Sequence, residues 1–251
     1  MKSQLPNTSV RLAFAGVKVV MFDVDNTLWD FRGNSPLALR HVFDVTPEVN
    51  RYVPYELFAR HYERRNGELW RLYHHGLISK EYLVNERFRY ALAASGCLAP
   101  GSVGLAAAMN VEYLRYLALL PGAVAGAAEL LEYLRKAGYR MCVVSNGFVG
   151  TQEQKLRSAG LLSYFDAVVL SEAVGVTKPF AGIYEAACQA MRCEASEAVM
   201  VGDDYEADIE GAASAGLRTI YFRRPASVPP ASAASVATAT VTSLATIRSL
   251  L

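Results

Sequence analysis

The chain has 251 residues, 52% hydrophobic and 20% charged, with a formal net charge of +1. This length fits an α/β core domain with a smaller accessory domain. The near-neutral charge and the lack of long basic runs exclude the electrostatic surface that a nucleic-acid polymer or a membrane attracts, so we expect a small-molecule partner.

The four cysteines show no spacing typical of a zinc site, and no apolar stretch is long enough for a signal peptide or a membrane span. We therefore expect a cytoplasmic enzyme, as a monomer or homodimer. Residues 1–16 carry no apolar pattern and are expected to form a flexible N-terminal tail.

A continuously apolar, β-branched run from Val17 to Phe22 opens the folded part of the chain, as expected of a buried parallel strand. Similar runs follow at Tyr139 to Val144, Ala167 to Leu170, Ala198 to Val201 and Arg218 to Phe222. The helical patterns between them end at Gly138, Gly160 and Gly216, where a helix terminus favours positive φ. This alternation predicts an α/β fold with a doubly wound parallel sheet.

Long helical periodicities without a strand occupy the segment 34–119, at Tyr55 to His74, Lys80 to Ala94 and Val103 to Leu119. We interpret it as an inserted α-helical cap domain, and residues 17–33 with 120–251 as a Rossmann-like catalytic core. Near the end of the core, residues 225–234 have the Pro, Ala and Ser composition of a surface loop. A last strand at 237–241 and a short helix capped by Thr242 or Ser243 should close the domain.

Asp23 and Asp25 directly follow the first strand, in FDVDNTLWD. Ligands of an open α/β sheet bind beyond the carboxyl ends of the strands, so both carboxylates are expected to face the active crevice. A turn built from Asp and Asn is the alternative interpretation.

Ser145, Asn146 and Gly147 end the second strand, in VVSNG, where a hydroxyl and close backbone N–H groups suit a phosphate oxygen. A plain turn would have the same residues. Lys178, in VTKPF, can bring a compact positive charge to a phosphoryl group. Otherwise it is a solvated surface lysine.

Asp203 and Asp204 follow the fourth strand in VMVGDDYEADIEGA, and Asp208 lies one turn into the next helix. Carboxylates at strand ends suit Mg²⁺, although an N-cap with acids in the first turn has the same pattern. Because all four motifs end or follow strands of one sheet, they converge at one edge, which favours the catalytic interpretation.

With DVDNT, Ser145, Lys178 and GDDYEAD in this order, the chain from Val17 onward resembles the haloacid dehalogenase-like (HAD) superfamily. The inserted helical unit is similar to the helical-cap subfamily. The segments DNTLWDFRGNSPLALR, LWRLYHHGLISKEYLVNERF and SNGFVGTQEQKLRSAGL are similar to a bacterial branch of pyrimidine 5′-nucleotidase and pyrophosphatase-like phosphatases.

The resemblance implies that Asp23 is the nucleophile, which forms an aspartyl-phosphate, and that Asp25 is the general acid and later the base. It implies that Ser145 and Lys178 hold the phosphoryl oxygens. Mg²⁺ is the implied cofactor. Its implied ligands are Asp23, Asp25 through its carbonyl, Asp203 and Asp208, with Asp204 as the alternative to Asp208.

The implied function is Mg²⁺-dependent hydrolysis of a small phosphorylated metabolite, a nucleoside 5′-monophosphate or alternatively pyrophosphate, a sugar phosphate or phosphoglycolate. Asp25 argues against a dehalogenase, whose leaving halide needs no proton, and the four intact motifs argue against a non-enzymatic binding module. The predicted substrate-binding residues are Ser145, Asn146, Lys178, Thr27, Asn34 and Trp29. The residues Trp70, Arg71, Tyr73, His74 and His75 could line a pocket for a nucleobase or second phosphate, or could pack between helices.

Overall fold

A computed structural model describes residues 11–97, 102–224 and 236–251 of the chain. The chain divides into two compact units, one made of Met1–Asp30 with Pro121–Leu251 and one of Phe31–Leu120. The predicted loop 225–234 and the first ten residues of the predicted tail lie outside the described residues. Within the tail, residues 11–16 form hydrogen-bonded turns, in which Phe14 is buried and the other five residues are exposed.

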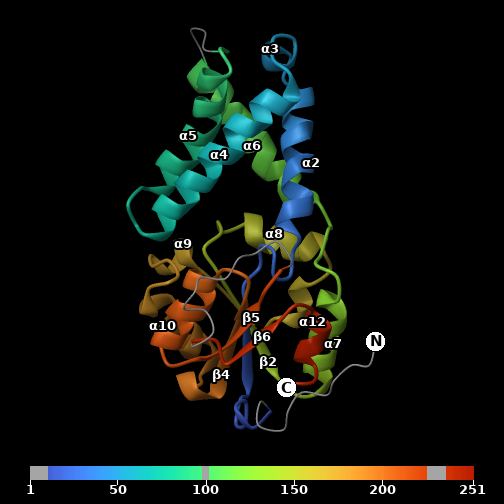
Figure 1. Cartoon of the computed structure of the whole chain (residues 1–251), viewed down its shortest axis with the longest axis vertical. Helices are drawn as coiled ribbons and strands as arrows, with labels where there is room; N and C mark the ends of the chain where they lie inside the picture. Colours follow the sequence, from blue (N-terminus) through green and yellow to red (C-terminus); the bar gives the residue numbers. More distant parts are fainter. Residues whose placement is uncertain (1–10, 98–101, 225–235) are drawn as a thin grey trace. The chain divides into compact units, whose positions relative to one another are not determined.

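The first unit is built on a six-stranded sheet in the order β3-β2-β1-β4-β5-β6, with every neighbouring pair parallel (Figure 1). The strands are β1 (Val19–Phe22), β2 (Arg140–Ser145), β3 (Ala167–Leu170), β4 (Ala198–Gly202), β5 (Arg218–Phe222) and β6 (Ala239–Val241). The central strands β1 and β4 are buried along their whole length, which explains their unbroken apolar sequences. The predicted doubly wound parallel sheet is confirmed.

Helices cover both faces of this sheet. α7 (Ala127–Lys136) and α12 (Leu244–Ile247) lie on one face, and α10 (Ala181–Met191) lies on the other with α11 (Gly211–Ser214) against it (Figure 1). α8 (Thr151–Ser158) follows β2, and α9 (Ser171–Val174) follows β3. Gly138, Gly160 and Gly216 have φ of +86°, +71° and +86°, as their positions after helices predict.

Short helical turns complete the first unit. Two are 3₁₀ turns, at Leu162–Tyr164 and Ala195–Glu197, and one is a wider π-helical turn at Tyr205–Glu210, between β4 and α11. The π turn begins at Asp204, whose carboxylate accepts a hydrogen bond from the backbone N–H of Ala207 at 3.0 Å. The sequence predicted an ordinary helix here. The wider turn matters because it carries Asp208.

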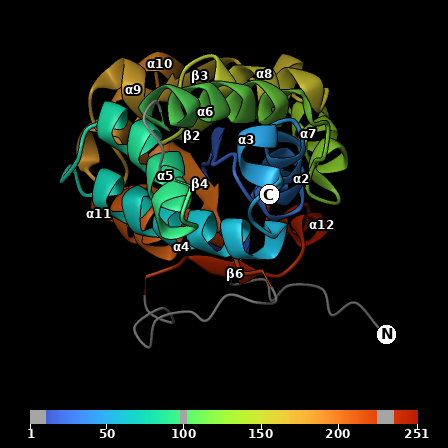
Figure 2. The same ribbon diagram turned by 90° about the horizontal axis from the view of Figure 1, so that it is seen from above.

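The second unit is helical throughout its described residues, as predicted. It consists of α2 (Phe31–Asp44), α3 (Pro47–Asn50), α4 (Tyr55–His74), α5 (Lys80–Ala94) and α6 (Ser102–Leu119). α5 packs against both α4 and α6, and α2 packs along α6 (Figure 2). Its interior holds the clustered rings of Phe58, Tyr62, Phe88 and Tyr113.

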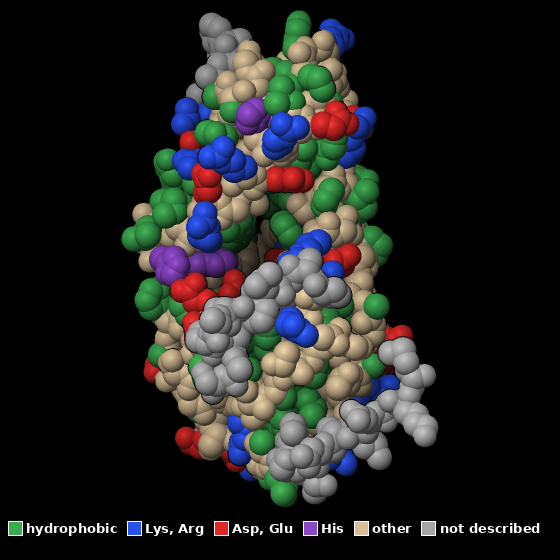
Figure 3. All heavy atoms as spheres, viewed as in Figure 1, with side chains coloured by type: hydrophobic (Ala, Val, Ile, Leu, Met, Phe, Trp, Pro, Cys, Tyr) green, Lys and Arg blue, Asp and Glu red, His purple; other side chains and the backbone are tan. Residues whose placement is uncertain are grey.

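The surface of the helical unit mixes charges of both signs on the face drawn in Figure 3. Several charged side chains of this unit pair within one helix, as Arg40 does with Asp44 and Arg64 with Glu68. Exposed pairs of this kind contribute little to stability. Across the described residues, the helices are all too short or too polar to cross a bilayer.

Candidate active site

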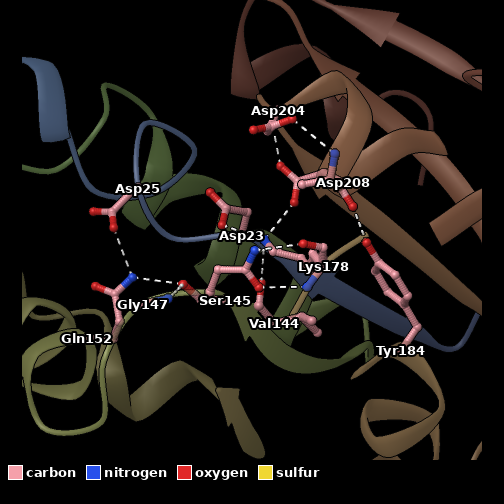
Figure 4. A network of polar contacts seen from close by, with 12 residues as sticks. Asp23, Asp25, Val144, Ser145, Gly147, Gln152, Lys178, Tyr184, Asp204 and Asp208 are labelled. Atoms are coloured by element: carbon pink, nitrogen blue, oxygen red, sulfur yellow. Dashed lines mark hydrogen bonds and ion pairs between the residues drawn. The ribbon is translucent and has the colours of Figure 1, made fainter. Parts of the chain in front are cut away.

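The strand register brings the four motifs to one edge of the sheet. Phe22 of β1 lies opposite Val201 of β4, and Asp23 accordingly follows β1 at the level where β4 ends and Asp203 follows it. On the other side, β2 runs beside β1 and ends at Ser145. Asp23, Ser145 and the acidic turn after β4 are therefore gathered within one unit (Figure 4).

Lys178 lies at the centre of this group. Its Nζ donates to Asp23 Oδ1 at 2.8 Å, to Asp208 Oδ1 at 2.7 Å and to the Val144 carbonyl at 2.9 Å. Burial alone would lower the pKa of Lys178, but the charges of Asp208 and Asp23 raise it above its usual value. The alternative of a solvated surface lysine is wrong, since this side chain is buried and keeps its charge inside the unit.

Asn146 holds the backbone of Lys178 from both sides. Its Oδ1 accepts from the Lys178 N–H at 2.7 Å, and its Nδ2 donates to the Lys178 carbonyl at 2.9 Å. The sequence predicted Asn146 as a residue that contacts substrate. In the structure, the Asn146 side chain also holds in place the backbone of the lysine that faces Asp23.

Asp23, Asp203 and Asp208 each offer a carboxylate oxygen, and these oxygens lie within 4.8 Å of one another. Burial raises the pKa of Asp208 well above its usual value despite Lys178, and burial likewise raises that of Asp23. Asp23 and Asp208 share the ammonium of Lys178, and with Asp203 they form a cluster of carboxylate oxygens, the ligand type that Mg²⁺ takes. The donor set thus fits Mg²⁺.

Asp204 points elsewhere. Its carboxylate caps the π turn, and its backbone N–H donates to Asp208 Oδ2 at 3.1 Å. A Cβ on Gly202 would collide with the Asp208 side chain, so a glycine at the end of β4 leaves room for this carboxylate. Of the two aspartates that the sequence left open, Asp208 is the one that lies with Asp23 and Lys178.

The Ser145 hydroxyl oxygen accepts two hydrogen bonds from the chain around it. Its Oγ accepts one hydrogen bond from the Gly147 N–H at 3.1 Å and one from Gln152 Nε2 at 2.8 Å. A hydroxyl has two acceptor lone pairs and one donor, so with both lone pairs occupied the O–H is directed at an incoming acceptor. A phosphate oxygen is such an acceptor.

Asp25 is turned toward α8 rather than toward Asp23 (Figure 4). Its carboxylate accepts from Gln152 Nε2 at 2.9 Å and from Lys155 Nζ at 2.8 and 3.0 Å. Sequence reasoning assigned no role to Gln152 or Lys155. Their spacing of three positions on the helix after Ser145 is the signal that could have found them, because it places both on one helical face.

Of the remaining predicted residues, Thr27, Trp29 and Asn34 are buried, Trp70, Tyr73 and His74 are partly buried, and Arg71 and His75 are exposed. Thr27 and Trp29 are fully buried in the loop after Asp25, and the ammonium of Lys155 lies 4.7 Å from the Trp29 ring centroid. Asn34 is buried in α2 of the helical unit. Trp70 contacts the rings of its α4 neighbours Tyr73 and His74, each at 5.7 Å between centroids. Contact of these side chains with a substrate stays a prediction.

Arg224, to which sequence reasoning assigned no role, holds the same loop in place. Its guanidinium donates to the carbonyl and side chain of Asn26 at 3.3 and 3.1 Å and to Asp30 at 3.0 Å. Asn26 adopts a φ of 66°, a left-handed conformation that Asn tolerates better than most residues. The loop that carries Asp25 is thus held at both ends.

Comparison with known proteins agrees with this geometry. The model of the family described as haloacid dehalogenase-like hydrolase matches residues 17–216. Pyrimidine 5′-nucleotidase PynA of Streptococcus pneumoniae is 32% identical over 82% of this chain and 83% of its own length. Ribulose-1,5-bisphosphate 5-phosphatase of Halopiger xanaduensis is 34% identical over 81% and 83%.

A solved structure of similar fold is that of the HAD-type hydrolase YfnB from Bacillus subtilis in a magnesium-bound form. It aligns with a TM-score of 0.78 and 27% identity, over 92% of this chain and 96% of that one. The site, the family match and the named relatives agree: the chain belongs to the haloacid dehalogenase-like hydrolases and is an enzyme of the phosphatase type.

Proposed function

We propose that the protein hydrolyses the phosphate monoester of a small metabolite, preferentially a nucleoside 5′-monophosphate, by transferring the phosphoryl group to Asp23. The observation that carries this proposal is the convergence of a carboxylate, a buried ammonium and a directed hydroxyl. Lys178 Nζ lies 2.8 Å from Asp23 Oδ1, and the Ser145 hydroxyl accepts two hydrogen bonds, which leaves its O–H to donate.

In the first step an oxygen of Asp23 attacks phosphorus while the bond from phosphorus to the ester oxygen breaks. The leaving oxygen takes a proton from Asp25. A carboxylate and a phosphate repel each other, so the positive charge of Lys178 and the Ser145 O–H must stabilise the phosphoryl oxygens during the attack.

In the second step a water attacks phosphorus of the aspartyl-phosphate, and Asp25 accepts its proton. The bond between phosphorus and the Asp23 oxygen breaks, which releases inorganic phosphate and restores the carboxylate. One residue can serve both steps because the acid of the first step is left as the base of the second.

Mg²⁺ would be held by Asp23, Asp203 and the backbone carbonyl of Asp25, with Asp208 close by. When bound, it supplies positive charge that offsets the repulsion between the phosphoryl group and the acidic cluster. The support for this assignment is the set of three carboxylate oxygens within 4.8 Å. Oxygen ligands are those that Mg²⁺ prefers.

Removal of divalent cations is expected to abolish activity. Chelation followed by desalting should leave a folded, inactive protein, and added Mg²⁺ should restore turnover. Ca²⁺, which is larger and accepts looser geometry, should inhibit instead. Phosphate release measured after exhaustive chelation is the test, and unchanged turnover would disprove the magnesium assignment.

The substrate class rests on similarity to the nucleotidase PynA, and similarity to a sugar-bisphosphate phosphatase keeps sugar phosphates as the second candidate. We expect a phosphate-release screen with Mg²⁺ to give the highest kcat/KM with a pyrimidine nucleoside monophosphate. Ribulose bisphosphate, phosphoglycolate and pyrophosphate belong in the same screen. Turnover of pyrophosphate alone would exclude the nucleotidase function.

A further inference from the structure

One face of α8 buries two polar side chains beside the active site. Gln152 is 0% and Lys155 3% exposed, and they lie three positions apart, on the same side of the helix. Lysine is almost never fully buried unless its charge is paired. Here the pairing partner is Asp25, with Lys155 Nζ at 2.8 Å from Oδ1 and 3.0 Å from Oδ2.

Stability alone does not explain this arrangement. The Lys155 side chain is 4% exposed, whereas that of Asp25 is 31% exposed. Removing the ammonium from water costs about as much as its attraction to the carboxylate returns, so this pair is weak evidence of a stabilising role. Gln152 adds a further cost, because its Oε1 is buried without a hydrogen-bond partner among the described residues. Gly147 makes room for it, since a Cβ there would collide with the Gln152 side chain.

The hydrogen bonds that the Asp25 carboxylate accepts determine which of its lone pairs is left to take up a proton. A carboxylate has about four acceptor positions, two on each oxygen. On Oδ2, both are taken by Lys155 and by Gln152 Nε2 at 2.9 Å, whereas the contacts described here give Oδ1 a single donor, Lys155. A proton delivered to this carboxylate is therefore directed to Oδ1.

Gln152 also connects Asp25 to the phosphoryl-binding hydroxyl. Its Nε2 donates to Ser145 Oγ at 2.8 Å and to Asp25 Oδ2 at 2.9 Å, one hydrogen to each. The amide orientation is set by the carboxylate, which can accept from the nitrogen but not from the amide oxygen. The centroid of the Trp29 ring lies 4.7 Å from Lys155 Nζ, which adds a cation–π contact to the ammonium.

We propose that Lys155 and Gln152 are positioning residues for Asp25, which fix the place and orientation of its carboxylate beside Ser145 for the dephosphorylation step. This inference rests on the proposed phosphatase mechanism. In that step the water oxygen bonds to phosphorus, its proton goes to Asp25 Oδ1, and the Asp23–phosphorus bond breaks with its electron pair returning to Asp23.

The test variant is Lys155→Met, which keeps the length of the side chain and removes its charge. With an aryl phosphate, whose leaving group scarcely needs a proton, the first step should proceed while the second slows. We expect steady-state turnover to fall by about 10- to 100-fold, the scale of a misplaced catalytic group. Intact-mass analysis during turnover should show accumulated aspartyl-phosphate.

The matched control is Lys136→Met, because Lys136 is an exposed lysine that pairs with Glu132 at 3.2 Å. It should leave turnover and the phosphoenzyme fraction unchanged. Gln152→Met is the second variant, with the same direction of effect, in case Lys155→Met does not fold. Thermal melts establish which variants are folded.

A double-mutant cycle with Asp25→Asn distinguishes positioning from a general structural effect. If Lys155 acts through Asp25, adding Lys155→Met to Asp25→Asn should slow dephosphorylation no further. Folded single variants with normal turnover, or a fall in rate without accumulated phosphoenzyme, would overturn the inference while the wild type remains active. A wild type that releases no phosphate from any ester would overturn the proposed function as well.

Discussion

Replacing Asp23 with Asn is expected to reduce the turnover of every phosphate ester by about 10⁴-fold or more, which is the size of effect expected when an enzyme loses its nucleophile. The amide has nearly the shape of the carboxylate but is not nucleophilic enough to attack phosphorus. Both half-reactions fail together, since no aspartyl-phosphate can form.

The fold should survive this change. Lys178 keeps its contacts with Asp208 at 2.7 Å and the Val144 carbonyl at 2.9 Å, so its charge is not left unpaired. Phosphate release and intact mass in the presence of an aryl phosphate are the measurements, and a thermal melt is the control. A variant that still gains the mass of a phosphoryl group would show that another residue is the nucleophile.

Replacing Asp25 with Asn should separate the two half-reactions. General acid and general base catalysis are each worth about 10²–10⁴-fold, and the amide provides neither. With an alkyl phosphate, whose leaving oxygen needs a proton, the first step should become too slow to measure. With an aryl phosphate Asp23 can still attack, and the enzyme should accumulate as aspartyl-phosphate.

The measurement compares the two substrates on one variant. Phosphate release reports the complete cycle, and intact mass reports the intermediate. Near-normal turnover of an alkyl phosphate by Asp25→Asn would contradict the acid role and, with it, the distinction from a dehalogenase on which the phosphatase mechanism depends.

Most of the sheet could be predicted from the sequence because its strands are buried on both faces. The predicted limits Ala167–Leu170 and Arg218–Phe222 are the strand limits of the structure, although the first half of β3 at the sheet edge is only partly buried. The helices Tyr55–His74 and Lys80–Ala94 could be predicted equally well from the sequence, since each has an apolar stripe with the helical period and a glycine just beyond its end.

Other elements could not be predicted, for physical reasons. α2 contains Gly33 and Pro36, which ordinarily indicate a turn, and its helical form depends on packing against α6. The π turn depends on the space that Gly202 leaves for Asp208, a tertiary fit without a periodic signature. The roles of Gln152 and Lys155 likewise depend on a partner more than a hundred positions away in the chain.

The reciprocal hydrogen bonds between Asn146 and the backbone of Lys178 have a consequence for the order in which the enzyme becomes active. A nascent chain that has emerged as far as β3 already holds Asp23, Asp25 and Ser145 but has no cation to set against the nucleophile. Asp208, which shares that cation, is synthesised later still. The ammonium that faces Asp23 is therefore in place only when the segment beyond β3 has folded against Asn146.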